Sequence, residues 1–184
     1  MRKYTQDDLS HRFAELGFLW PQNHLIGVRS IDDKGDAYDD QFYWIENGLL
    51  FNSYSGTTNP GSYYLQEFLN KAMGGTAIMA TNQQMISGFV KGLHKERVAW
   101  RQYRPMRIFR DADKDLKSEE VGLPFIGMYG IHIHAMFRSK KSERIFNWSA
   151  ACQGMNDPIE WAQFIDRSYL KCDRFLSYTL LSEF

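Results

Sequence analysis

The run from Gln41 to Tyr54 constrains the fold more than any other part of the chain. Two segments rich in aromatic and aliphatic residues, Gln41–Glu46 and Leu49–Tyr54, flank the dipeptide Asn47-Gly48. Asparagine and glycine take the two positive φ angles of a type I′ turn more readily than other residues do. The sequence therefore predicts a β-hairpin with a two-residue turn.

Further short segments have the composition of strands: His24–Arg29, Thr76–Ala80, Val98–Tyr103, Pro105–Arg110 and Phe175–Phe184. Helices are expected mainly at the two ends. One starts after an N-cap at Thr5 and stops at Gly17, and another starts at Asn156 or Asp157, with Pro158 in its first turn. The stretch 63–73 is expected to be a brief helix or irregular.

No linker or repeat divides the chain. We expect a single β-rich α+β domain over residues 1–184, on which residues 1–20 pack as an N-terminal helical segment.

Charge and hydropathy narrow the classes of partner. Lysine and arginine number 22, aspartate and glutamate also 22, and the two signs are interspersed, so a nucleic-acid partner is not expected. No apolar run reaches membrane-spanning length, and the N-terminus lacks the apolar core of a signal peptide. These features predict synthesis in the cytoplasm. Only Cys152 and Cys172 are present, so two free thiols are expected, although one bridge between them stays open.

Candidate reactive groups converge in Gly130–Met155. Residues 130–137 alternate in polarity, which predicts a strand with His132 and His134 on one face. Cys152 follows eighteen residues after His134, among small residues that leave its sulfur accessible. A cysteine beside a histidine is the minimum for a thiol nucleophile, and the amides of Ala151 and Cys152 are candidates to bind an oxyanion.

Two other interpretations of these residues remain open. A cysteine among alanines is often a small core residue. The His-x-His pair is also typical of metal sites, but further ligands would have to come from His94, Cys152 or scattered carboxylates. We therefore expect no metal and no cofactor.

Gly130–Gln153 resembles the catalytic region of L,D-transpeptidases, in which a histidine at a strand end precedes a Ser/Thr-His-Gly-Cys motif. The resemblance places His134 as the catalytic histidine, Ser149 as the Ser/Thr and Cys152 as the nucleophile. It implies a β-rich fold of mixed sheets or a sandwich. It also implies action on peptidoglycan stem peptides, with a thioester formed as D-alanine leaves and the acyl group then passed to an amine or to water.

The chain departs from that pattern at four positions, where it has Ala135, Ala150, Ala151 and Gly154. His132, on the same strand face as His134, is expected to supply part of the support lost with the second histidine of the motif. Ser149 and Ala151 are the other supporting residues expected at the site. Trp148 and Gln153, which flank the motif, are the candidate substrate contacts.

Several segments, among them Gly56–Gly61 and Trp148–Gln153, also look similar to uncharacterised proteins of bacteriophages and their hosts. A phage or its lysis system would deliver a wall-directed enzyme that lacks a signal peptide. The alternative is a non-catalytic virion or tail component, or a wall-binding protein, in which exposed aromatic residues such as Trp20, Tyr63 and Tyr64 matter more than Cys152.

Overall fold

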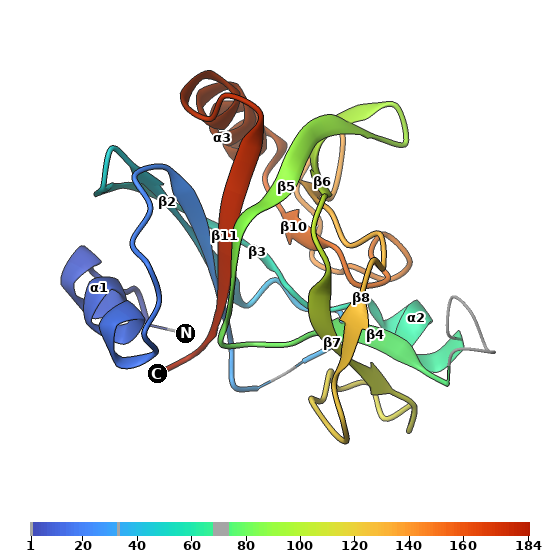
Figure 1. The fold of residues 1–184 in the computed structure, drawn as a ribbon. Coiled ribbons are helices and arrows are strands. Elements are labelled where there is room, and N and C mark those ends of the chain that lie inside the picture. The colour runs from blue at the N-terminus through green and yellow to red at the C-terminus, as the bar shows by residue number, and fades with distance from the viewer. Residues whose placement is uncertain (1, 33, 68–73) are drawn as a thin grey trace.

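A computed structural model of the chain describes residues 2–32, 34–67 and 74–184. Eight strands form a closed barrel in the order β1-β11-β5-β6-β9-β10-β3-β2, and three form a second sheet in the order β4-β7-β8. The second sheet lies beside the barrel, on the side away from α1 (Figure 1).

The strands of the barrel are β1 (His24–Arg29), β2 (Asp40–Glu46), β3 (Leu49–Thr57), β5 (Gln83–His94), β6 (Arg97–Gln102), β9 (Ile133–Ala135), β10 (Gln153–Met155) and β11 (Phe175–Ser182). Those of the second sheet are β4 (Thr76–Met79), β7 (Met106–Asp111) and β8 (Phe125–Gly127). The pairs β1/β11 and β9/β10 are parallel, and the other pairs are antiparallel.

The predicted β-rich α+β class is confirmed, but the main sheet is a closed barrel and not a sandwich. The last strand closes it, because β11 pairs with β1 on one side and with β5 on the other. Closure of this kind leaves no unpaired edge in the barrel.

The predicted hairpin is confirmed as the β2–β3 pair. Its two turn residues, Asn47 and Gly48, have φ angles of 52° and 81°. The local turn chemistry was sufficient here, because both residues adopt positive φ at low cost.

The two terminal helices are also confirmed. Helix α1 (Gln6–Glu15) is capped by Thr5, whose side chain accepts from the amide of Asp8 while the Asp8 carboxylate accepts from the amide of Thr5. Helix α3 (Pro158–Lys171) is capped by Asp157. The described part of the expected helix at 63–73 is α2 (Ser62–Glu67); residues 68–73 lie outside the described residues. No helix in the described ranges combines the length and apolarity needed to cross a membrane.

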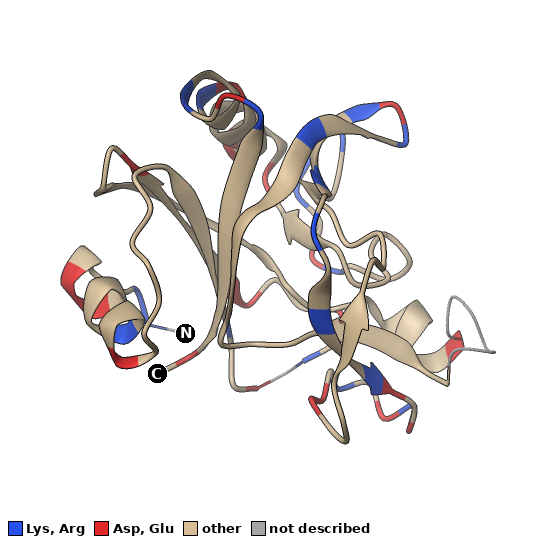
Figure 2. Ribbon diagram, in the orientation of Figure 1, with Lys and Arg blue, Asp and Glu red and all other residues tan. Residues whose placement is uncertain are grey.

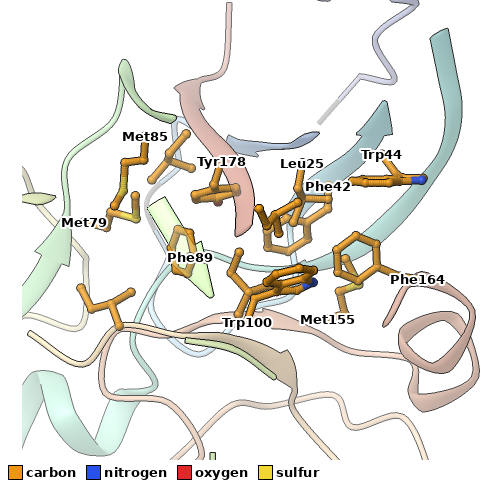
Figure 3. Close-up of a cluster of buried hydrophobic side chains, with 14 of the residues drawn as sticks. Leu25, Phe42, Trp44, Met79, Met85, Phe89, Trp100, Met155, Phe164 and Tyr178 are labelled. Carbon is orange, nitrogen blue, oxygen red and sulfur yellow. The ribbon is translucent and has the colours of Figure 1, made fainter. Parts of the chain in front are cut away.

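Strands β1, β2 and β11 bury both faces, which explains why their sequences are nearly continuous apolar runs. Alternate residues fill the barrel, including Leu25, Phe42, Trp44 and Tyr178 (Figure 3). Those between them form a second cluster with helix α1: Ile26, Val28, Tyr43, Ile45 and Leu181, with Leu9 and Phe13 from the helix. The N-terminal segment thus packs on the outside of the barrel.

The longest strand, β5, was not predicted from the sequence. Gly88 and Gly92 interrupt it, Ser87 has a φ of 51°, and its register against β11 shifts between Leu176 and Tyr178. Because of this irregularity, polar and apolar residues do not alternate regularly along the segment. The strand is recognised only from its pairing with β6 and β11.

Candidate functional site

The alternation around His134 persists in the structure, although β9 is shorter than the predicted strand over residues 130–137. Three apolar residues of this stretch are buried in the barrel core: Ile131, Ile133 and Ala135. His132 and His134 both contact the ring of His94. The alternation ends at Met136, which is also fully buried.

Parallel pairing of β10 with β9 brings Cys152 beside the histidines. Cys152 immediately precedes β10, and the backbone amide of His132 donates a hydrogen bond to its sulfur over 3.4 Å. The carbonyl of Gly130 lies 3.8 Å from the same sulfur. Both cysteines of the chain are free, and Cys172 is buried elsewhere in the core.

His94 completes the group from the end of β5. Its ring is stacked on that of His134, with centroids 5.0 Å apart and an interplanar angle of 28°, and it meets His132 edge-on at 4.8 Å. One ring nitrogen of His94, one of His134 and the sulfur of Cys152 all lie within 4.8 Å of one another.

Hydrogen bonds require different tautomers of the two strand histidines. Nδ1 of His134 lies 2.8 Å from the carbonyl oxygen of Ala135 and must donate to it, so in the neutral ring Nε2 carries the lone pair. That Nε2 is buried and has no partner among the described residues. Nδ1 of His132 instead accepts from the amide of Gln102 over 3.1 Å, which fastens this ring to β6.

Desolvation is the main cause of the shifted pKa values at the site. It lowers the pKa of His134 to about 4 and that of His132 to about 4, and it lowers the pKa of His94 as well. Desolvation raises the pKa of Cys152 to about 11, although the amide of His132 acts in the opposite direction. At neutral pH the free protein therefore holds a neutral thiol and neutral imidazoles rather than a preformed ion pair.

The loop before Cys152 is held from within the protein. The hydroxyl of Ser149, which is buried, donates to the carbonyl of Cys152 over 3.0 Å, and the carbonyl of Ser149 accepts from the amide of Gly61. Among the described residues, the amides of Ala151 and Cys152 donate to no protein group. Both residues border an open cleft.

Cys152 opens on a cleft of about 560 Å³ between the barrel and the second sheet. Aromatic rings of Tyr64, Tyr129 and Trp148 line it, together with Lys95 and Arg110. No described residue of its lining is acidic. Basic residues also mark the turn between β5 and β6, beside one glutamate (Figure 2). The cleft thus favours an anionic ligand with apolar parts.

The two predicted substrate contacts lie in different places. Trp148 is half exposed, lines the cleft and packs edge-on against Phe137. Gln153 is fully buried, accepts from the hydroxyl of Tyr178 over 2.7 Å and donates to backbone carbonyls. The structure therefore does not bring Gln153 to the cleft.

Comparison of the chain with protein families, curated proteins and solved structures finds no match.

His94, which the sequence marks only as a possible further metal ligand, lies against both strand histidines in the structure. No local pattern marks it, because its position depends on two long-range pairings. β5 pairs with β6, and Trp100 of β6 then pairs with Ile133 of β9. The turn that follows gives no local signal either, because Lys95 and Glu96 both take positive φ where Asn or Gly would be expected.

Proposed function

We propose that this chain is a divergent L,D-transpeptidase-type domain that transfers or hydrolyses an acyl group through a thioester on Cys152. The observation that carries the proposal is the juxtaposition of the Cys152 sulfur, which borders the open cleft, and a ring nitrogen of the buried His134 behind it. The order of the two residues along the chain and the strand position of His134 match the resemblance described above.

In this mechanism His134 acts as a general base at the moment of attack. The thiol proton passes to Nε2 of His134 as the sulfur bonds to the substrate carbonyl carbon, and the oxyanion is held by the amides of Ala151 and Cys152. His134 then donates that proton to the leaving amine, which leaves a thioester. Water or an acceptor amine attacks the thioester, loses a proton to His134, and the thiol is restored.

The lining of the cleft supports a peptide substrate with free carboxylates. Lys95 and Arg110 supply positive charge, and the aromatic rings offer surfaces for aliphatic side chains. Stem peptides of peptidoglycan, which end in D-alanine and carry carboxylates, have this chemistry. A phage or lysis system would bring the enzyme to the wall.

One observation favours a second candidate, a non-catalytic binding protein. Between β7 and β9 several large apolar side chains are exposed: Val121, Leu123, Phe125, Ile126 and Met128. Exposed apolar surface of this kind is typical of protein-binding regions. Of the aromatic residues named in the sequence analysis, Tyr63 is exposed, whereas Trp20 packs on Phe13 and His24.

The decisive experiment incubates purified protein with stem tetrapeptides and pentapeptides and follows products and intact protein by mass spectrometry. Wild type is expected to release D-alanine, with or without a new cross-link, and to carry a transient acyl group. Cys152→Ala is expected to lose both. His134→Gln is expected to lower kcat/KM by roughly 10²–10⁴-fold, the range typical of general-base catalysis.

Cys172→Ser is the matched control, because Cys172 is the other free thiol and lies outside the cleft. It should turn over like wild type. Absence of any peptide product or acyl adduct with wild type, in protein shown to be folded, would reject the enzyme and favour the binding protein.

A further inference from the structure

His94, His134 and Cys152 form a set of metal donors that the acyl-transfer mechanism does not need. They come from β5, β9 and the loop before β10, and their donor atoms lie within 4.8 Å of one another. Donors of a tetrahedral zinc ion, bound at about 2.0–2.3 Å, are separated by roughly 3.3–3.8 Å. Side-chain adjustments of about an ångström would therefore bring all three onto one ion.

The second observation is the unsatisfied Nε2 of His134. Its residue is only 8% exposed, and this nitrogen has no hydrogen-bond partner in the described part of the chain. The bond from Nδ1 to the carbonyl of Ala135 orients the ring and leaves the Nε2 lone pair free. A backbone carbonyl behind a ligating histidine is the usual outer-shell arrangement of zinc sites. An unpaired buried nitrogen otherwise costs stability.

The donor types favour Zn²⁺ over Mg²⁺ or Ca²⁺. Two imidazoles and one thiolate suit a borderline-soft cation, whereas the harder ions require oxygen ligands. Three protein ligands leave a fourth position for water or another ligand, and two of the three residues, His94 and Cys152, line the cleft. This is the pattern of open zinc sites.

Nearby positive charge makes the negative thiolate of Cys152 especially important for zinc binding. Lys95 follows His94 in the chain and Arg97 pairs with His94 across the β5–β6 turn, so their positive charges oppose a dication there. Loss of the thiol proton on metal binding supplies the compensating negative charge. Removal of Cys152 should therefore weaken zinc binding more than removal of either histidine.

We propose that His94, His134 and Cys152 bind one Zn²⁺ ion with its fourth position open to the cleft. Zinc binding does not require that the protein catalyse acyl transfer. Bound zinc would inhibit acyl transfer, because a zinc-bound sulfur is unavailable as a nucleophile.

The test measures Zn²⁺ affinity of tag-free protein by competition with a chromophoric chelator, and metal stoichiometry by elemental analysis. We expect one ion per chain with a micromolar or lower dissociation constant. Affinity should fall at least a hundredfold in Cys152→Ala and at least tenfold in His94→Ala. His94 lies beside the turn at the end of β5 and is only partly buried, so its variant is expected to fold even where a His134 variant does not.

His11→Ala and Cys172→Ser are the matched controls, because they remove the same donor types outside the site, and they should bind zinc like wild type. Zn²⁺ should also protect Cys152, but not Cys172, from alkylation in denaturant-free buffer. Co²⁺ should add a thiolate-to-metal charge-transfer band that Cys152→Ala lacks.

Millimolar affinity in wild type, or equal affinity in wild type, His94→Ala and Cys152→Ala, would overturn the proposal. None of these readouts involves turnover. Failure of the acyl-transfer assay therefore leaves the zinc result intact, and the reverse also holds.

Discussion

His24 is the residue whose protonation should affect the stability of the fold most simply. It is fully buried between α1 and the barrel, where its ring contacts Phe13 and Trp20. Nδ1 donates to the carbonyl of Pro21, and Nε2 has no partner among the described residues. Burial lowers the pKa of His24 to about 4. Folding thus favours the neutral ring.

The folded pKa lies below the ordinary value of 6.5, so the unfolded chain binds more protons between these two values. The stabilising contribution is complete above about pH 6.5 and is lost as pH falls toward 4, by about 3 kcal/mol at most. In urea unfolding, we expect wild type to lose more stability than His24→Gln as the pH falls from 6.5 to 4, because glutamine does not titrate. Parallel stability–pH curves for the two proteins would contradict this assignment.

At the same scale, the sequence predicted the proximity of two candidate residues better than it predicted their surroundings. Cys152 and His134 are close in space, as their spacing and the resemblance suggested. Their pKa values were not predictable, because both depend on desolvation by residues distant in the sequence. The buried position of Gln153 and the contact of His94 with both strand histidines depend on the same packing.

Among the elements, β10 explains why glycine stands at position 154. This strand is held between β3 and β9, where Gly154 pairs with Thr57 on one side and His134 on the other. A Cβ atom at Gly154 would lie 2.0 Å from the sulfur of Met136. At this departure from the L,D-transpeptidase pattern, the Met136 side chain therefore occupies the space that a larger residue would need.

Gly154→Ala is expected to lower the free energy of unfolding by about 1–3 kcal/mol, the usual cost of overpacking a core. The double variant Met136→Ala/Gly154→Ala removes the side chain in the way. It should lose less stability than the sum of the two single variants, by urea denaturation. Strict additivity would show that Met136 does not close this position.

For the whole molecule, the fully buried Arg29 links the barrel to the second sheet. Its guanidinium donates to the hydroxyl and carbonyl of Thr58 after β3, and it forms an ion pair with Glu120 in the connection between β7 and β8. The buried Asp40 accepts from the amide and hydroxyl of Thr58. Burial raises the pKa of Asp40 to about 6, while the charge of Arg29 opposes that rise.

Arg29→Met is expected to cost about 3–5 kcal/mol, because it leaves buried carboxylate charge uncompensated. Arg29→Met/Asp40→Asn should recover part of that loss. Lys34→Met, which removes an exposed ion pair with Asp32, is the control and should leave the unfolding midpoint nearly unchanged. A small effect of Arg29→Met in chemical denaturation would argue against a structural role for this cluster.

The sequence by itself determined the features that depend on neighbouring residues. The Asn47-Gly48 turn, the capped ends of α1 and α3, and the alternation that turns His132 and His134 to one face all follow from local backbone preferences. Only the tertiary structure decided the closed barrel, the irregular strand β5 and the place of His94. These depend on which strands pair across long separations, and burial at those pairings then sets the protonation of Cys152 and His134.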